Sequence, residues 1–273
     1  MSELSLLPLV YEKSGAIATF TLNRPAARNA LTPELVCRLA DALRDFAGDP
    51  ALRVGILTGT GDKAFCAGGD LGTMLPLISG DRSPADAWDR RVLDEPFVMA
   101  ASGLRDFPID KPVIAAVNGA CLAGGMEMLL GTDIRIAADH AVFGLPEVRR
   151  GVIPFAGSLV RLTRQIPHAL AMEFLLTGEP VTAAQAQRLG LVNHVVPAAD
   201  VLPRALELAQ RIAANGPVAV QAVKRTVRDT SGLPLAQAWA VENEAKRVVM
   251  ASDDAREGPR AFMEKREARF TGR

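Results

Sequence analysis

Short runs of apolar residues recur along the first half of the chain and define its regular structure. Four of these runs are rich in β-branched residues, and each is followed by Asn, Gly or Asp. They cover residues 17–22, 53–58, 113–117 and 134–138. Runs of this length and composition are typical of strands that are buried in an α/β architecture.

Helical patterns lie between these runs and continue after them. Thr32 is a good N-cap, Pro33 suits the first helical turn, and Glu34 is favourable at the positive end of the helix dipole. Apolar residues then recur at helical spacing as far as Gly48, which predicts one buried stripe. Further helices are expected at 202–213, 217–228, 235–250 and, as a charged closing helix, 259–270.

The strand signals stop near Pro197, and this change divides the chain. We expect residues 1–196 to form an α/β core that contains the active site. Residues 197–273 are expected to form a helical C-terminal region, without a flexible linker between the two. The sequence contains no fixed-period repeat and no low-complexity tract.

Two segments share one design, a strand that runs into small residues and then a helix start. They are residues 64–71 and 118–127. Small residues let a ligand approach the backbone, and free N–H groups at a helix start point into the positive end of the dipole. Two such N–H groups can hold one carbonyl oxygen and stabilise it further as it becomes an enolate, and one such donor is worth roughly 3 kcal/mol.

Two glutamates lie in otherwise uncharged surroundings, each next to a glycine turn. Glu127 ends the second glycine segment, and Glu147 follows Pro146 twenty residues later. Burial among apolar side chains disfavours the carboxylate and raises its pKa into a range that suits proton transfer. The chain must fold back for both to act on one substrate. Alternatively, Glu127 simply stabilises a helix start, and Glu147 pairs with a neighbouring arginine.

The charge balance excludes some partners. The sequence has 31 basic and 31 acidic residues, so no general attraction to nucleic acid or to an anionic membrane is expected. The first 13 residues lack the pattern of a signal peptide, and the longest uncharged stretch, 112–126, is too short for a membrane span. We expect a cytoplasmic protein.

Cysteines and histidines give no sign of a metal site. The three cysteines are an odd number without zinc-ligand spacing: Cys37, Cys66 and Cys121. The three histidines are equally scattered: His140, His168 and His194. This pattern fits reduced thiols in a cytosolic protein without a bound metal.

Five motifs in order resemble the crotonase superfamily, the enoyl-CoA hydratase/isomerase family, over nearly the whole chain. They lie at 23–31, 63–71, 112–127, 143–154 and 176–192, and the end at 261–266 resembles the family's closing helix. The resemblance implies a spiral of ββα units with a C-terminal helical oligomerisation region. It also implies a homotrimer or a dimer of trimers.

The resemblance assigns roles to residues. The backbone N–H groups of Ala67 and Gly124 would form an oxyanion hole, and Glu127 and Glu147 would activate water and exchange a proton next to a thioester. Retention of both glutamates favours hydration of a 2-enoyl-CoA without a metal or redox cofactor. An enoyl-CoA isomerase, an acyl-CoA hydrolase and a catalytically silent CoA-binding assembly subunit are the alternatives.

Coenzyme A is part of the implied substrate, held by the first glycine segment and by two basic residues. Arg28 and Lys265, the latter across a subunit boundary, are candidates for its phosphates, although each is equally well explained as a solvated surface charge. The candidate CoA contacts are Arg28, Ala64, Gly68, Gly69, Asp70, Leu71 and Lys265.

The sequence departs from the family pattern at several points. Ala123 replaces the first of three glycines, which we expect to be a mild change, and Phe155 replaces a glycine and could reshape the acyl pocket. Arg149 and Arg150 make the segment after Glu147 unusually basic. The insertion at 72–107 either roofs the acyl pocket or forms surface helices. Cys66 and Cys121 are expected to be packing residues rather than nucleophiles.

Overall fold

A large, mostly parallel sheet forms the centre of the computed structural model, which describes residues 7–105 and 109–273. In that described part the sheet has six strands in the order β1-β2-β3-β5-β7-β10, and β1 alone runs antiparallel to its neighbour. The strands are β1 (Leu9–Ser14), β2 (Ile17–Leu22), β3 (Val54–Gly59), β5 (Val113–Val117), β7 (Ile134–Ala138) and β10 (His194–Val196). The four expected strands are confirmed, with β3 shifted by one residue.

A second, smaller sheet is formed by strands that alternate along the chain with those of the large sheet. Its order is β4-β6-β8-β9, from β4 (Ala64–Cys66), β6 (Ala120–Leu122), β8 (Val142–Gly144) and β9 (Val181–Thr182). Each turn of the chain thus gives one strand to the large sheet and the next to the small sheet, which is the expected ββα spiral. Because β4 pairs in parallel with β6, the two glycine segments leave the small sheet side by side.

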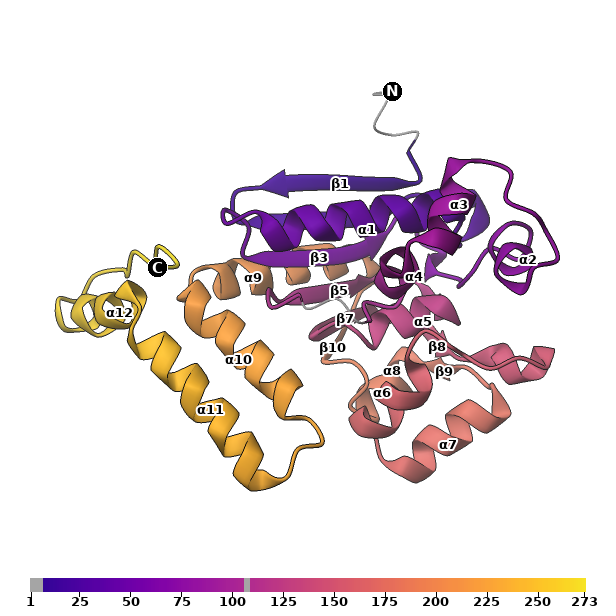
Figure 1. Cartoon of the computed structure of the whole chain (residues 1–273). Helices are drawn as coiled ribbons and strands as arrows, with labels where there is room; N and C mark the ends of the chain where they lie inside the picture. The colour runs from indigo at the N-terminus through magenta and orange to yellow at the C-terminus, as the bar shows by residue number, and fades with distance from the viewer. Residues whose placement is uncertain (1–6, 106–108) are drawn as a thin grey trace.

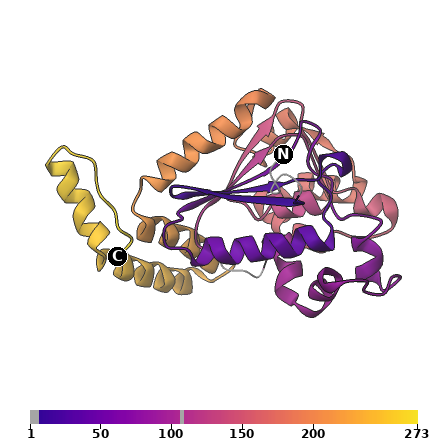
Figure 2. The ribbon, with the colours of Figure 1, turned by 90° about the horizontal axis from the view of Figure 1, so that it is seen from above.

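Two long helices cover the large sheet, and the strands lie between them (Figure 2). Helix α1 (Pro33–Gly48) begins at Thr32, whose side chain accepts a hydrogen bond from the Leu35 amide as expected for an N-cap. Its apolar stripe is buried, and Phe46 packs edge-on against Phe20 of β2. Helix α9 (Val201–Ala213) buries Val201, Ala205 and Ala209 against the strands, so it packs with the core.

Shorter helices surround the small sheet. The segment after β4 forms α2 (Met74–Ser79), α3 (Ala87–Asp94) and α4 (Pro96–Ser102). Later turns form α5 (Gly124–Leu129), the 3₁₀ helix η3 (Pro146–Arg150), α6 (Ser158–Gln165), α7 (His168–Thr177) and α8 (Ala183–Arg188). Figure 1 shows α2, α4, α5 and α6 around one end of the molecule.

The last three helices project from the opposite end (Figures 1 and 2). They are α10 (Pro217–Thr230), α11 (Leu235–Met250) and α12 (Asp253–Met263). Helix α9, the first α-helix after residue 197, covers the sheet, whereas these three extend beyond it. The expected helix at 259–270 is misplaced: α12 begins at Asp253, after the cap Ser252, contains Pro259 and ends at Met263.

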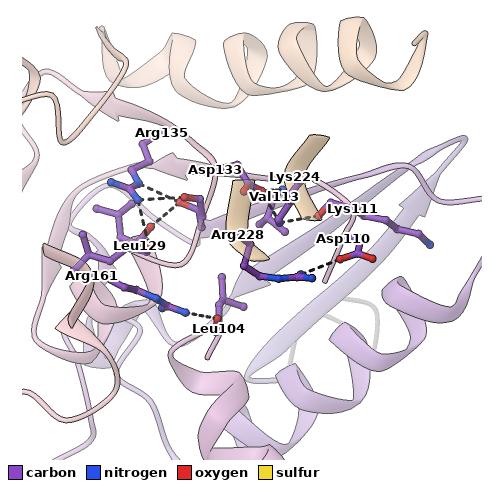
Figure 3. A network of polar contacts seen from close by, with 12 residues as sticks. Leu104, Asp110, Lys111, Val113, Leu129, Asp133, Arg135, Arg161, Lys224 and Arg228 are labelled. Carbon is purple, nitrogen blue, oxygen red and sulfur yellow. Dashed lines mark hydrogen bonds and ion pairs between the residues drawn. The ribbon is translucent and has the colours of Figure 1, made fainter. Parts of the chain in front are cut away.

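Ion pairs fasten α10 to the core (Figure 3). Lys224 contacts Asp133 at 2.7 Å and donates to the Lys111 carbonyl oxygen at 3.0 Å. Arg228 contacts Asp110 at 2.8 Å. These bonds fix the direction in which the projecting helices leave the core.

Within the described residues, no helix is both long and apolar enough to cross a membrane. The same part of the chain contains no cluster of three or more metal-ligating side chains.

Candidate active site

Both predicted glutamates line one cavity of about 250 Å³, which lies beside the ends of β4 and β6. The glycine segments form one wall through Gly69 and Gly124, and the start of η3 forms another. Apolar side chains such as Met74 and Leu122 complete it. Two carboxyl groups and several backbone amides therefore meet in a largely apolar space, which suits reactions that move protons and develop charge on an oxygen.

Glu127 is held by backbone amides from a later segment. Its side chain belongs to α5 and is only 3% exposed. Its Oε1 accepts hydrogen bonds from the amides of Ala156 at 2.6 Å and Ser158 at 3.3 Å, at the start of α6. Burial raises the pKa of Glu127, and these amide hydrogen bonds oppose that rise because they favour the charged form.

Glu147 has no such support. It lies in the first turn of η3, and its Oε2 is buried without a hydrogen-bond partner among the described residues. Burial raises the pKa of Glu147 to about 7, and the nearby charge of Glu127 adds to the rise, while the residue's own backbone amide and the charge of Arg150 oppose it. The two carboxyl groups therefore sit close enough to influence each other, as the fold-back of the chain requires.

The amides of Gly124 and Gly69 are adjacent and face the cavity. Gly124 is the first residue of α5, and a Cβ placed on it would lie 3.5 Å from the Gly69 nitrogen. Across the described chain, neither N–H donates to a protein acceptor. Both donors are thus available to one ligand oxygen, as a dipole-aligned helix start allows.

The structure corrects the prediction that the Ala67 amide forms half of the oxyanion hole. It lines the cavity, but its amide donates to the Arg28 carbonyl oxygen at 3.1 Å. A committed N–H cannot also hold a substrate oxygen, so Gly69 takes the place that was expected for Ala67.

Close packing between the two glycine segments explains their residue choice. A Cβ on Gly125 would lie 2.4 Å from the Cys66 carbonyl oxygen, and one on Gly68 would lie 2.6 Å from the Ala123 methyl. Ala123 itself has φ 49° and ψ −124°, a conformation that favours glycine. Alanine at this position is therefore strained, while the amide of Gly124 stays free as expected.

The remaining candidates in the first glycine segment have varied surroundings. Ala64 is 1% exposed, and its carbonyl oxygen accepts from Asn29 and Asn118, so this chain presents no Ala64 surface to a ligand. The Asp70 carboxylate caps the following turn and contacts Arg24 at 3.0 Å. The contacts of Ala64 and Asp70 therefore hold the loop in place.

Gly68 is buried, and its φ of 101° turns the loop. The other candidates lie at the surface, and Leu71 is 65% exposed at the cavity edge. Arg28 is exposed beside this loop. Lys265 is exposed just after α12, which lies at the far end of the molecule from α2 and α5 (Figure 1). Within one chain, Lys265 cannot reach the cavity.

The insertion both lines the cavity and forms surface helices. Met74 and Ile78 of α2 and Met99 of α4 face the cavity, whereas Trp88 and Phe97 instead stack under arginines of α1. Its last two residues, including Phe107, lie outside the described residues. Phe155, also at the cavity, is 52% exposed and stands at the entrance.

The cysteines near the site are buried thiols. Burial raises the pKa of Cys66 to about 12 and that of Cys121 well above its usual value. Thiols in this state are poor nucleophiles, in agreement with a packing role.

Sequence reasoning missed three contributors to the site: the amide of Gly69, the amides that hold Glu127, and the side chain of Arg150 in the cavity wall. Glycine at position 69 and the small residues 156–158 before α6 were the available signals. Neither signal reveals which amide is free.

Comparison with known proteins agrees with this geometry. The sequence profile described as "Enoyl-CoA hydratase/isomerase" matches residues 12–273. Enoyl-CoA hydratase EchA19 of Mycobacterium tuberculosis is 44% identical over 262 residues, 96% of each chain. Carnitinyl-CoA dehydratase of Escherichia coli K12 is 38% identical, and the match covers 96% of this chain and 97% of that protein.

Solved structures agree as well. The crystal structure of an enoyl-CoA hydratase from M. tuberculosis H37Rv superimposes with a TM-score of 0.85 at 38% identity, over 98% of this chain and 100% of that one. Enoyl-CoA hydratase EchA1 from Mycobacterium marinum gives 0.86 at 38% identity over the same shares. The chain belongs to the enoyl-CoA hydratase/isomerase family and has the crotonase fold.

Proposed function

We propose that this protein is an enoyl-CoA hydratase that adds water across the 2,3 double bond of a 2-enoyl-CoA thioester. The observation that carries the proposal is the meeting of Glu127, Glu147 and the free amides of Gly69 and Gly124 in one cavity. The names of a hydratase and a dehydratase among its relatives support the same reaction in its two directions.

The chemistry divides among these groups. The two amides hold the thioester oxygen and stabilise it as negative charge develops there. Glu127, whose charged form is favoured by its two amide partners, accepts a proton from the water that attacks C3. Glu147, whose pKa lies near 7, donates a proton to C2, so that the elements of water are added across the bond.

A panel of 2-enoyl and 3-enoyl thioesters tests the proposal. The loss of enoyl absorbance is followed, and products are identified by mass spectrometry and chromatography. Hydration yields a 3-hydroxyacyl-CoA from the 2-enoyl substrates. A shifted double bond would identify an isomerase, and release of free thiol would identify a hydrolase. If no product forms, the remaining alternative is a catalytically silent CoA-binding assembly subunit.

We also propose that the chain assembles as a homotrimer or a dimer of trimers. Helix α11 has no buried residue, and its Trp239 is 58% exposed, while Phe262 of α12 is 81% exposed. Large apolar side chains in such numbers favour a protein partner. Assembly would also allow Lys265 of one subunit to approach CoA on another, and light scattering that finds a stable monomer at micromolar concentration would refute it.

A further inference from the structure

Two arginines follow the Glu147 turn, and η3 sends them in different directions. In a 3₁₀ helix, residues three apart lie on the same face. Arg150 is three residues after Glu147, and both line the cavity. Arg149 instead contacts Glu179 at 3.1 Å, near β9.

The guanidinium of Arg150 has N–H donors without a close acceptor. Its positive charge acts on the Glu147 carboxyl group, whose pKa it lowers, but the two form no ion pair within the described chain. Its single hydrogen bond there is a long one of 3.4 Å to the Pro146 carbonyl oxygen. A guanidinium carries five N–H donors in a fork that matches a carboxylate. Of the described residues that line the cavity, Arg150 alone is cationic.

The position of Arg150 suits the far end of an acyl group. The cavity of about 250 Å³ is smaller than the ~300–1,000 Å³ of sites that enclose a drug-sized ligand, so it holds a thioester and a short acyl chain. Arg150 is exposed as well as cavity-lining, which places it at the entrance. An acyl group whose thioester is held at the Gly69 and Gly124 amides shares one cavity with Arg150.

We propose that Arg150 is a specificity-determining residue that selects acyl-CoA thioesters whose acyl group ends in a carboxylate. The proposal rests on the proposed function, because it assumes that the acyl group occupies this cavity. A terminal carboxylate would form a bidentate pair with the free guanidinium, whereas a methyl terminus would leave those donors to water. The remaining cavity walls are apolar and suit the methylene chain between the two ends.

Binding of two saturated thioesters of equal chain length tests this selection. Calorimetry with adipoyl-CoA and hexanoyl-CoA compares a carboxylate with a methyl terminus, and neither ligand can be hydrated. We expect the wild type to bind adipoyl-CoA roughly ten- to a hundredfold more tightly. Arg150→Gln should lose this preference and bind hexanoyl-CoA as before, and Arg150→Lys should keep only part of it.

Arg149→Gln is the matched control, since it removes the same charge one residue away and should keep the full preference. Equal wild-type affinity for the two ligands would overturn the proposal. So would a preference that survives Arg150→Gln, or an equal loss of affinity for both ligands and for free CoA, which would assign Arg150 to the CoA phosphates. Turnover of 2-hexenoyl-CoA is measured separately, so a selective but inactive protein would refute the hydratase function alone.

Discussion

Helix α5 and the 3₁₀ helix η3 bring one glutamate each to the same cavity, but the two glutamates have different surroundings. Glu127 of α5 is 3% exposed and accepts two backbone amides from the start of α6. Glu147 of η3 is partly exposed, yet its Oε2 is buried without a partner in the described structure.

This difference shows that burial alone does not decide the protonation state of a carboxyl group. Burial raises the pKa of both glutamates. Glu127 has two amides from another segment that oppose the rise, whereas Glu147 has only its own backbone amide and the charge of Arg150, and its pKa reaches about 7. Two residues of the same type can therefore act as acid and base on one substrate. The predictions below test this contrast, beginning with α5.

The largest effect is expected from Gly124→Pro, because α5 supplies an amide donor and η3 does not. Proline removes the N–H that would hold the thioester oxygen, so turnover should fall below detection. Gly124→Ala keeps the donor, and its Cβ would lie 3.4 Å from Leu31, an ordinary contact, so it should retain most activity. A Gly124→Pro protein that is folded by circular dichroism and works at the wild-type rate would refute the assignment.

The exchange of either glutamate for glutamine should lower turnover by roughly a hundredfold or more. Glutamine keeps the size of the side chain but cannot exchange the proton. Binding of saturated acyl-CoA should stay nearly unchanged, which separates chemistry from affinity. Near-normal turnover of Glu127→Gln or Glu147→Gln would remove that residue from the mechanism.

Glu147→Gln should also stabilise the fold at alkaline pH, by about 1 to 2 kcal/mol after allowance for solvent screening. The folded pKa of about 7 lies above the ordinary value of 4.5, so the wild type loses stability as pH rises from 4.5 through 7. The variant has no such loss, and its advantage should vanish below pH 4.5. Chemical denaturation at pH 8 and pH 4 measures this, and a variant less stable than the wild type at pH 8 would contradict it.

A smaller effect is expected at the start of α5. Ala123 adopts φ 49° and ψ −124°, so Ala123→Gly should relieve strain and raise the free energy of unfolding by about 1 kcal/mol. Ala240→Gly, in the exposed interior of α11, is the control and should lower it by a similar amount. If both variants lose stability, Ala123 is not strained.

The sequence predicts the long elements better than the short ones. Strand β5 consists of five apolar residues and β7 of four with Arg135, which is enough signal to place them. The strands of the small sheet have only two or three residues, so no periodicity can form in them, and pairing with neighbours decides their conformation. The C-terminal helix expected at 259–270 is misplaced, because proline often marks the first turn of a helix. Here Ser252 carries the capping hydrogen bond, so the helix begins before Pro259.

At the site, the residue types were predictable but their partners were not. Uncharged surroundings indicate Glu127 and Glu147, and the structure brings both to one cavity, while their catalytic roles stay predictions. The free amide could not be chosen from sequence, because the Ala67 amide is occupied by the Arg28 carbonyl oxygen from a distant turn. The same holds for the amides of Ala156 and Ser158 on Glu127.

The tight contact of Gly125 with the Cys66 backbone has a consequence for how proteins with this fold can diversify. The main chains of two successive turns meet where even a methyl group would lie 2.4 Å from an oxygen, so the backbone itself sets the separation of the turns that carry the Gly69 and Gly124 amides. Side chains at the other end of the cavity, on α2, α4 and η3, take no part in that spacing. Mutations there can change the shape of the cavity during evolution while the spacing of the two amides stays constant.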